Sequence, residues 1–134
     1  MANTFASLFP HVAVTDGITV RVAVSYLADQ SSPPAGRWFW SYHIRLENKR
    51  DHAVQLLARH WIIRDANGRV HEVRGAGVVG DTPLILPGNS YDYVSGCPLD
   101  TSHGSMIGAF HMVDEAGSTF DVAIPEFVLE APQA

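Results

Sequence analysis

Apolar and polar positions alternate along most of this chain, which is the pattern of β-strands with one buried face. After a Thr15-Asp16-Gly17 turn, residues 18–26 alternate large apolar side chains with smaller or polar ones, and residues 38–46 do so more strongly. A period of two places successive side chains on opposite faces of a strand. The apolar face of the second segment consists of Trp38, Trp40, Tyr42, Ile44 and Leu46.

Turn signals separate these segments from further β-rich stretches. Residues 30–36 contain two prolines and suit an exposed loop, because proline lacks the backbone donor that a helix or central strand needs. Asn67-Gly68 predicts a hairpin, since both residues tolerate positive φ. The further expected strands are 54–64, 69–73, one short strand fed by the Pro87-Gly88 turn within 84–94, then 105–113, 119–124 and 127–129. No window shows a helical period, so the sequence predicts an all-β antiparallel β-sandwich of about seven to eight strands.

The chain has the size and composition of one folded domain. Its 134 residues are 46% hydrophobic and 17% charged. This composition excludes a disordered chain, because disorder requires low hydrophobicity together with high net charge. We expect a single domain over residues 1–134, with residues 1–11 and 130–134 as loosely ordered ends.

The sequence contains neither a membrane span nor an export signal. No apolar run approaches the roughly 18 residues that cross a bilayer, and residues 1–10 lack the basic start and apolar stretch of a signal peptide. Cys97 is the only cysteine, so no internal disulfide and no cysteine-based zinc site can form. We expect Cys97 to be a small buried side chain, and the protein to be cytoplasmic without a membrane partner.

Charge is distributed unevenly along the chain, with a formal net charge of -5. Residues 1–74 hold all nine basic side chains and six acids, whereas residues 75–134 hold eight acids and no basic side chain. Apolar residues interrupt both halves, so we expect both to contribute to the same sandwich. Binding to nucleic acid is disfavoured, because it relies on a net basic surface.

A glycine-rich segment, Gly75-Ala76-Gly77-Val78-Val79-Gly80, matches the G-x-G-x-x-G pattern of dinucleotide-binding proteins. That pattern needs a following helix to bind the phosphates, and Asp81-Thr82-Pro83 leaves no room for one. A weaker hypothesis is a nest of backbone amides that binds a small anion. Its candidate residues are Arg59, Arg74, Gly75, Gly77 and Gly80, with Arg59 expected on a paired strand. Alternatively, the glycines only permit a tight crossover between the sheets.

Seven histidines raise the question of a metal site, because neutral imidazole is a good ligand for cobalt or zinc. They are His11, His43, His52, His60, His71, His103 and His111. Their spacing matches no metal motif, although His60 could converge in space with His71 or His111. We expect structural or solvated histidines, no metal site and no cofactor.

No catalytic motif is apparent either. The chain lacks a G-x-S-x-G nucleophile elbow, and Ser95-Gly96-Cys97-Pro98 has no base nearby in the sequence. Asp114 and Glu115 lie at an expected hairpin turn, where solvated acids are common. Strand alternation also sends His60 to the face opposite Arg59 and Trp61, so these three cannot act as one cluster. We therefore expect a protein that is not an enzyme.

Several ordered motifs resemble the ApaG family. They are residues 57–63 (LARHWII), 72–80 (EVRGAGVVG), 86–88 (LPG), 95–99 (SGCPL), 104–106 (GSM), 120–122 (FDV) and 124–127 (IPEF). The resemblance spans nearly the whole chain. It implies an immunoglobulin-like or fibronectin type III-like sandwich, which agrees with the strand pattern. It also implies a link by name and genetics to cobalt tolerance and magnesium efflux, and a gene neighbourhood that contains a diadenosine tetraphosphate hydrolase.

The resemblance further implies a recognition role, because similar domains are appended to certain F-box proteins and to a polymerase-delta-interacting protein. Our first hypothesis is a non-catalytic module that binds a protein or a small ligand through the glycine-rich segment, neighbouring loops and sheet edges, with aromatic side chains supplying most of the affinity. The alternatives are a sensor of small anions or polyphosphate nucleotides, direct binding of a divalent cation, and a hydrolase. A long sheet edge would also allow two copies to pair as a homodimer.

Overall fold

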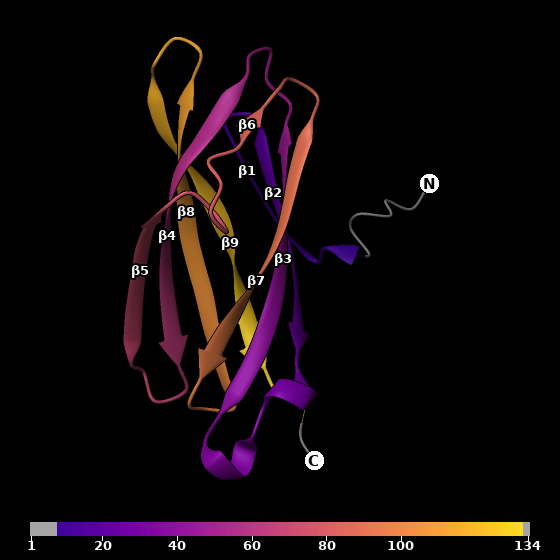
Figure 1. The fold of residues 1–134 in the computed structure, drawn as a ribbon, viewed down its shortest axis with the longest axis vertical. Helices are drawn as coiled ribbons and strands as arrows, with labels where there is room; N and C mark the ends of the chain where they lie inside the picture. The colour runs from indigo at the N-terminus through magenta and orange to yellow at the C-terminus, as the bar shows by residue number, and fades with distance from the viewer. Residues whose placement is uncertain (1–7, 133–134) are drawn as a thin grey trace.

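The computed structural model describes residues 8–132, which form two antiparallel sheets facing each other (Figure 1). The first sheet has the order β1(His11–Thr15), β2(Ile18–Tyr26), β3(Trp38–Asn48), β7(Ser90–Leu99). The second has the order β5(Val70–Ala76), β4(Val54–Asp65), β8(His103–Asp114), β9(Thr119–Glu130), and the short β6(Leu84–Ile85) also pairs with β4. Two 3-10 turns, η1(Ala28–Gln30) and η2(Pro33–Ala35), lie in the loop before β3. No helix among residues 8–132 has the length and apolarity to cross a membrane.

The core lies between the sheets and is built by the period-two alternation of the strands. On β3, every second side chain from Trp40 to Leu46 is buried while the intervening ones are partly exposed. The largest fully buried side chains include Trp40, Phe110, Phe127, Ile44, Leu46, Leu56, Met106 and Met112. The prediction of an all-β sandwich with a single core is therefore confirmed.

The two predicted hairpins are also present. β4 and β5 are joined through Asp65, whose side-chain Oδ1 accepts hydrogen bonds from the backbone N–H groups of Asn67 and Arg69, and Gly68 has φ of 81°. β8 pairs with β9 over a longer span than the sequence pattern indicated. These hairpins provide the strand pairs β4–β5 and β8–β9 of the second sheet.

The strand inventory differs from the sequence-based expectation in three respects. Residues 11–15, for which no strand was expected and of which only residue 11 fell in the predicted loose end, form β1, and the two-residue β6 raises the number of strands to nine among residues 8–132. The two strands expected at 119–124 and 127–129 are one continuous strand, β9. Pro125 lies in it where the pairing with β8 shifts register between Met106 and Gly108. Proline is tolerated there since β9 is an edge strand and a bulge needs no ladder donor.

Part of the predicted loose ends lies outside the described residues, namely 1–7 and 133–134. Within the described part, Phe9 is 5% exposed and its ring meets the edge of the His43 ring, with 4.9 Å between centroids. β9 continues to Glu130, which the prediction had placed at the start of the C-terminal loose end.

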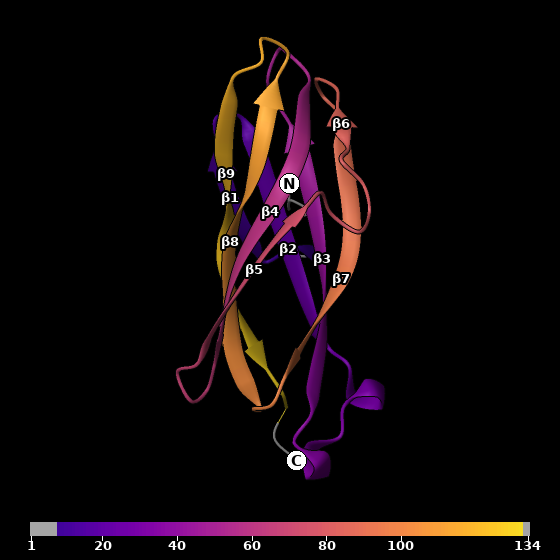
Figure 2. The ribbon, with the colours of Figure 1, turned by 60° about the vertical axis from the view of Figure 1, so that its left-hand side comes forward.

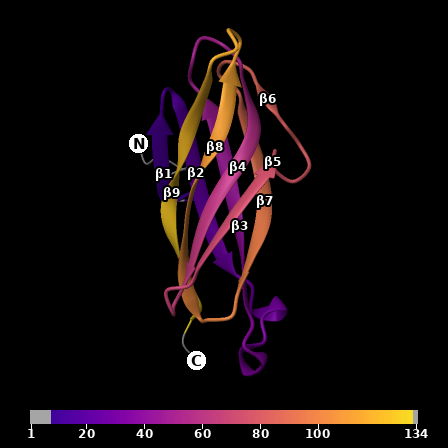
Figure 3. The same ribbon diagram turned by 90° about the vertical axis from the view of Figure 1, so that its left-hand side faces the viewer.

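The sandwich is closed along one side and open along the other. β9 packs against β1 and β2, so the two sheets meet on that side. On the opposite side the edge strands are β5 and β7. They lie close together where β5 ends and move apart towards the β4–β5 hairpin (Figure 2). Figure 3 shows β4 and β5 crossing in front of β3 and β7. On this side no strand pairing or packing joins the edges of the two sheets as β9 does on the other.

The glycine-rich segment forms a tight turn at the narrow end of this open side. Val78 and Asp81 exchange backbone hydrogen bonds of 2.8 Å in both directions, and Val79 and Gly80 between them have φ of 44° and 85°. Gly77 has φ of 61°, and a Cβ there would collide with the carbonyl oxygen of Asp81. The chain then continues into β6, with no helix between residues 77 and 90. The expectation that this segment is not a dinucleotide fingerprint is therefore confirmed.

The alternation of β9 can be tested by truncating neighbouring side chains. Phe127 is 1% exposed and Val128 is 55% exposed. We expect Phe127→Ala to lower the unfolding free energy by about 3–5 kcal/mol through cavity formation, and Val128→Ala to lower it by less than about 1 kcal/mol. Urea unfolding of both variants is the measurement. Equal losses would contradict the assignment of these faces.

Candidate functional site

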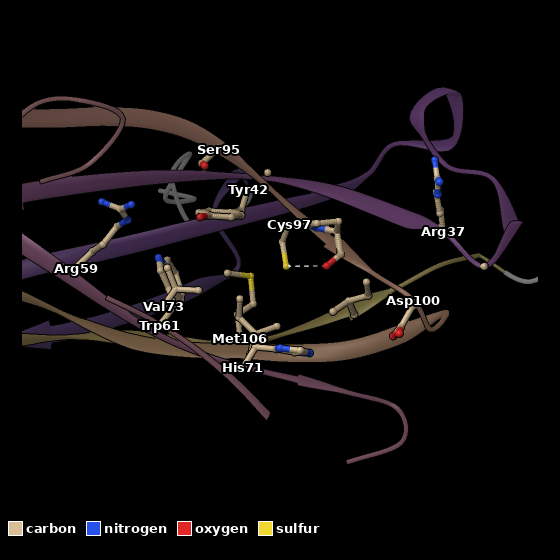
Figure 4. A pocket seen from close by; sticks show the side chains of 15 residues that line it. Arg37, Tyr42, Arg59, Trp61, His71, Val73, Ser95, Cys97, Asp100 and Met106 are labelled. Atoms are coloured by element: carbon tan, nitrogen blue, oxygen red, sulfur yellow. Dashed lines mark hydrogen bonds between the residues drawn. The ribbon is translucent and has the colours of Figure 1, made fainter. Parts of the chain in front are cut away.

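A groove of about 700 Å³ opens between edge strands β5 and β7. We call it the edge groove. Side chains from β3, β4, β5, β7 and β8 line it, together with the loop before β3 (Figure 4). The lining residues are Gly36, Arg37, Tyr42, Arg59, Trp61, Ile63, His71, Val73, Ser95, Gly96, Cys97, Pro98, Leu99, Asp100 and Met106. Because it is concave and mainly apolar with a few polar groups, it has the character of a ligand site.

Three packed aromatic rings support the lining of the groove. The Tyr42 and Trp61 rings have centroids 5.3 Å apart, and Phe127 contacts both with centroid distances of 6.0 Å. Trp61 meets Phe127 edge-on at 90°. Edge-to-face packing of this kind is favourable beyond simple burial, so these rings form a rigid base for the groove.

Arg59 lies at the narrow end of the groove and is fixed to the glycine-rich segment. Its Nη1 donates hydrogen bonds to the carbonyl oxygens of Ala76 at 3.0 Å and Gly77 at 2.9 Å. The guanidinium lies over Gly75, where a Cβ would be only 2.8 Å from Cζ of Arg59. Glycine at position 75 therefore leaves the space that the guanidinium occupies.

The narrow end contains polar groups that are buried without a partner. Trp61 is 2% exposed, and its indole Nε1 has no hydrogen-bond partner among residues 8–132. The hydroxyl of Tyr93, which points inward from β7 behind the lining of the groove, is likewise buried and unpaired. Figure 4 shows the Arg59 guanidinium, the indole nitrogen of Trp61 and the hydroxyl of Tyr42 facing the same end of the groove. Buried donors normally have a partner, so this end is suited to a bound group.

Burial raises the pKa of two phenols at or behind this end above the ordinary tyrosine value. It raises the pKa of Tyr42, and a hydrogen bond with Ser95 and the charge of Arg59 only partly oppose this rise. The pKa of Tyr93 is raised mainly by burial and further by Tyr42, with Arg59 again opposing. Both hydroxyls are therefore hydrogen-bond donors throughout the neutral pH range.

Cys97 is buried beside the groove as an inert thiol. Burial raises its pKa to about 11, and its Sγ lies 3.8 Å from the carbonyl oxygen of Pro98. Because the thiolate is the nucleophilic form, the thiol is unreactive at neutral pH. The expectation of a small buried side chain at Cys97 is confirmed, since the residue is 2% exposed.

The structure brings together only part of the predicted anion site. Arg59 pairs with Gly75 in the β4–β5 ladder, as the prediction of a paired strand required. Arg74 instead points to the outer face of the sheet, where Nη2 is 4.0 Å from Glu72. Gly80 is exposed at the tip of the turn. The five residues therefore do not form one cluster.

The backbone of the glycine-rich segment is largely engaged in internal hydrogen bonds. The N–H of Gly77 donates to Leu57, and those of Val78 and Asp81 donate to each other's carbonyl oxygens. The carbonyls of Ala76 and Gly77, in turn, face the guanidinium of Arg59. These bonds leave few amides for the anion nest that the sequence suggested.

The histidines are dispersed over both faces of the sheet. His71 lines the edge groove, whereas His60 and His111 lie on the outer face. His60 Nε2 is 3.5 Å from Glu72, and His111 Nδ1 is 2.8 Å from Asp121. Among residues 8–132, no group of three or more His, Cys, Asp or Glu side chains is arranged to hold a metal ion.

Sequence reasoning did not identify Tyr42, Trp61 and Tyr93 as site residues. Alternation placed Tyr42 on an apolar strand face and left Trp61 between core and sheet surface, and all three side chains are buried. A signal was nevertheless present, because tyrosine and tryptophan each carry a polar atom that needs a partner when buried. Whether that partner comes from the protein depends on which strands pair, and the sequence pattern does not contain this information.

Comparisons with known proteins agree on one family. A family model described as the ApaG domain matches residues 28–114. Protein ApaG of Paramagnetospirillum magneticum is 52% identical over 118 residues, covering 88% of this chain and 91% of the relative. Protein ApaG of Mesorhizobium japonicum is 52% identical over 120 residues, covering 90% of this chain and 92% of the relative.

Solved structures share the same fold. A Bordetella pertussis protein named ApaA superimposes with a TM-score of 0.84 at 45% identity, covering 87% of this chain and 95% of its own. The C-terminal domain of wzt superimposes with a TM-score of 0.57 at 7% identity, covering 100% of this chain and 87% of its own. At that identity the second likeness concerns the fold alone.

The buried thiol predicts a loss of stability in alkali. The thiol pKa is 9.0 without burial and about 11 in the fold. Between these values the unfolded chain has released a proton that the folded chain retains. The unfolding free energy should therefore be unaffected by the thiol below about pH 9 and fall by ~1.4 kcal/mol per pH unit above it. Urea unfolding at pH 7–10.5 measures this slope. Cys97→Ala should flatten it between pH 9 and 10, and an unchanged slope would contradict the assignment.

Proposed function

The chain belongs to the ApaG domain family, as its motifs predicted, and we propose that it is a non-catalytic recognition module that binds its partner in the edge groove. One observation carries the proposal. The open side of the sandwich holds a groove of about 700 Å³ whose narrow end presents a clamped arginine and a buried, unpaired indole N–H. Such a concave site with a few oriented polar groups is the usual form of a binding pocket.

The lining supports recognition because it offers aromatic and apolar surface on a rigid base. Tyr42, Trp61 and Met106 are buried in the core and contribute to the groove at the same time. Binding surfaces draw most of their affinity from a few such anchors, and tyrosine, tryptophan and arginine are the side chains most often found there. Little conformational entropy would be lost on binding, since the rings already pack against one another.

The borders of the groove offer a second mode of contact. β5 and β7 are edge strands of their sheets, so each has backbone N–H and C=O groups without a neighbouring strand. An extended protein segment could add to either edge while its side chains enter the groove. This geometry favours a protein partner, and it would also allow two copies of the chain to pair.

A non-catalytic role is supported by the state of the possible nucleophiles. The Cys97 thiol has a pKa of about 11, and Ser95 interacts with Tyr42, which is not a base at neutral pH. No hydrogen bond joins His71 to Ser95 or Cys97 among residues 8–132. A hydroxyl or thiol nucleophile requires a base within hydrogen-bond reach, and none faces these two.

The alternatives receive less support from the geometry. A polyphosphate sensor would need free amides in the glycine-rich segment and Arg74 beside them, but the amides of Gly77, Val78 and Asp81 bond internally and Arg74 lies on the other face. Direct cation binding would need a convergent ligand set, and residues 8–132 contain no such group. We therefore propose that the family's association with cobalt and magnesium is indirect and acts through the partner. A single reduced, buried cysteine fits a cytoplasmic setting.

A pair of matched substitutions on β5 tests the proposal. Val73 faces the groove at 37% exposure, and Val70 faces outward at 47% exposure. Immobilised protein is incubated with cell extract, with an unrelated β-sandwich domain as a control. A partner enriched by the wild-type protein should still be captured by Val70→Arg. The amount captured by Val73→Arg should fall roughly tenfold or more, because a charge would enter the apolar lining.

Two results of this capture would count against the edge groove. The first is a partner that binds Val73→Arg as well as it binds Val70→Arg. The second is a wild-type protein that enriches nothing beyond the unrelated domain. Thermal unfolding of both variants checks that the substitutions leave the fold intact, since both side chains are partly exposed.

The absence of catalysis is tested separately. Incubation of the purified protein with phosphate esters and dinucleoside polyphosphates should give no turnover above a buffer control. The physical reason is the lack of a base beside Ser95 or Cys97. Turnover that Ser95→Ala or Cys97→Ala abolishes would reject the non-catalytic part of the proposal.

A further inference from the structure

We propose that the narrow end of the edge groove is an oxyanion subsite that binds the carboxylate of an organic acid, with the acid's apolar part lying along the rest of the groove. This inference rests on the proposed function, because it assumes that the groove binds a ligand and then names the chemistry of that ligand. The subsite consists of the guanidinium of Arg59, the indole N–H of Trp61 and the hydroxyl of Tyr42.

The groups that converge at the narrow end are hydrogen-bond donors. Arg59 uses only Nη1 for the carbonyls of Ala76 and Gly77, and a guanidinium carries further N–H groups on Nε and Nη2. The indole N–H of Trp61 can donate but never accept. The Tyr42 hydroxyl is protonated at neutral pH and can donate, and behind the lining the buried Tyr93 hydroxyl is unpaired. A bound group must therefore supply acceptors.

The positive charge of Arg59 has no carboxylate partner of its own. Among residues 8–132, no ion pair joins Arg59 to an acidic side chain. The only acidic residue that lines the groove is Asp100, which lies at the opposite end from Arg59 and pairs with Arg69 at 3.4 Å (Figure 4). A ligand anion would therefore meet no repelling carboxylate in the lining at the narrow end.

The guanidinium is also held in place before any ligand binds. Two carbonyl contacts and the surface of Gly75 fix its position, so little side-chain freedom remains to be lost. Arginine presents a planar set of donors that suits a carboxylate, and hydrogen bonds to an ionised group are stronger than neutral ones. A fixed cation beside a buried N–H donor is therefore a suitable site for an oxyanion.

The remaining lining explains why the ligand should carry an apolar group. Ile63, Met106 and Leu99 line the groove further from Arg59 than Val73, which lies beside Trp61 (Figure 4), and Met106 and Leu99 are buried. An inorganic ion would leave this surface uncovered. An aromatic or aliphatic acid would cover it while its carboxylate occupies the narrow end.

The main competing explanation is that Arg59 serves only to hold the glycine-rich segment. In that case its removal would destabilise the loop and have no specific effect on acids. Tyr42→Phe separates the two explanations, because it removes a donor and leaves the Arg59 contacts intact. Arg74→Gln is the matched control for charge, since Arg74 is on the paired strand and 71% of its side chain is exposed on the outer face.

The experiment is an NMR titration of isotope-labelled protein with phenylacetate and with the neutral, similarly shaped phenylacetamide. The indole N–H resonance of Trp61 reports directly on the subsite. That of Trp40 serves as an internal reference, because its Nε1 donates to the carbonyl oxygen of Glu130 at 3.2 Å. The chain has three tryptophans, Trp38 being the third, and substitution of each by phenylalanine assigns the three indole resonances.

We expect phenylacetate to shift the Trp61 resonance saturably and to bind roughly tenfold or more tightly than phenylacetamide. Arg59→Gln and Tyr42→Phe should each markedly lower the affinity for phenylacetate. Arg59→Gln should also reduce the preference for the acid over the amide to about twofold or less. Arg74→Gln should change the affinity for phenylacetate by less than about twofold. Phenylalanine-ended short peptides with a free or an amidated carboxyl group then distinguish a chain terminus from a free organic acid as the source of the carboxylate.

The possible failures are distinguishable. Equal binding of acid and amide in the edge groove would overturn the oxyanion subsite and leave the recognition groove standing. Loss of acid binding in Arg74→Gln but not in Tyr42→Phe would also overturn it, and would move the site towards the outer face. If no probe or peptide perturbs any groove resonance, and the captured partner is equally indifferent to Val73→Arg, the proposed function fails as well.

Discussion

Strand β9 packs against β1 and β2, so the two sheets are joined along one long side of the sandwich. Each sheet has an apolar inner face that must be covered, and on this side the opposing sheet covers it. On the other side β5 and β7 diverge, and the inner faces are only partly covered. The edge groove is the consequence of this asymmetric closure, and its lining is core surface that remains accessible.

The glycine-rich segment acquires a structural meaning from the same asymmetry. Gly75 leaves space for the guanidinium of Arg59, and Gly77 allows the backbone of the turn to approach Asp81 closely. Arg59 in turn bonds the carbonyls of this segment and stands at the narrow end of the groove. The pattern that resembles a nucleotide fingerprint therefore shapes the narrow end of the edge groove. It lacks the helix that a phosphate site of that kind requires.

Much of the fold could be predicted from the sequence because strand alternation and turn chemistry are local. The apolar face of β3, the hairpin at Asn67-Gly68 and the placement of His60 opposite Trp61 all follow from a period of two. β1 was missed because five residues near a chain end carry a weak pattern. The continuity of β9 was missed because Pro125 normally ends a strand, unless a bulge on an edge accommodates it.

The site was less accessible to sequence reasoning because it depends on which edges remain apart. Arg74 is adjacent to Gly75 in the sequence, yet alternation on β5 turns it to the other face. Whether the indole of Trp61 finds a partner depends on the strands that pack around the groove, which no local pattern reports.

The open side of the sandwich is the proposed binding surface. A crystallographic screen with small neutral and anionic aromatic fragments tests it most directly. We expect fragments to gather in the edge groove, with the oxygens of the acids at Arg59 and Trp61. Fragments that gather instead on the outer face around His60 and His111, with none between β5 and β7, would contradict it.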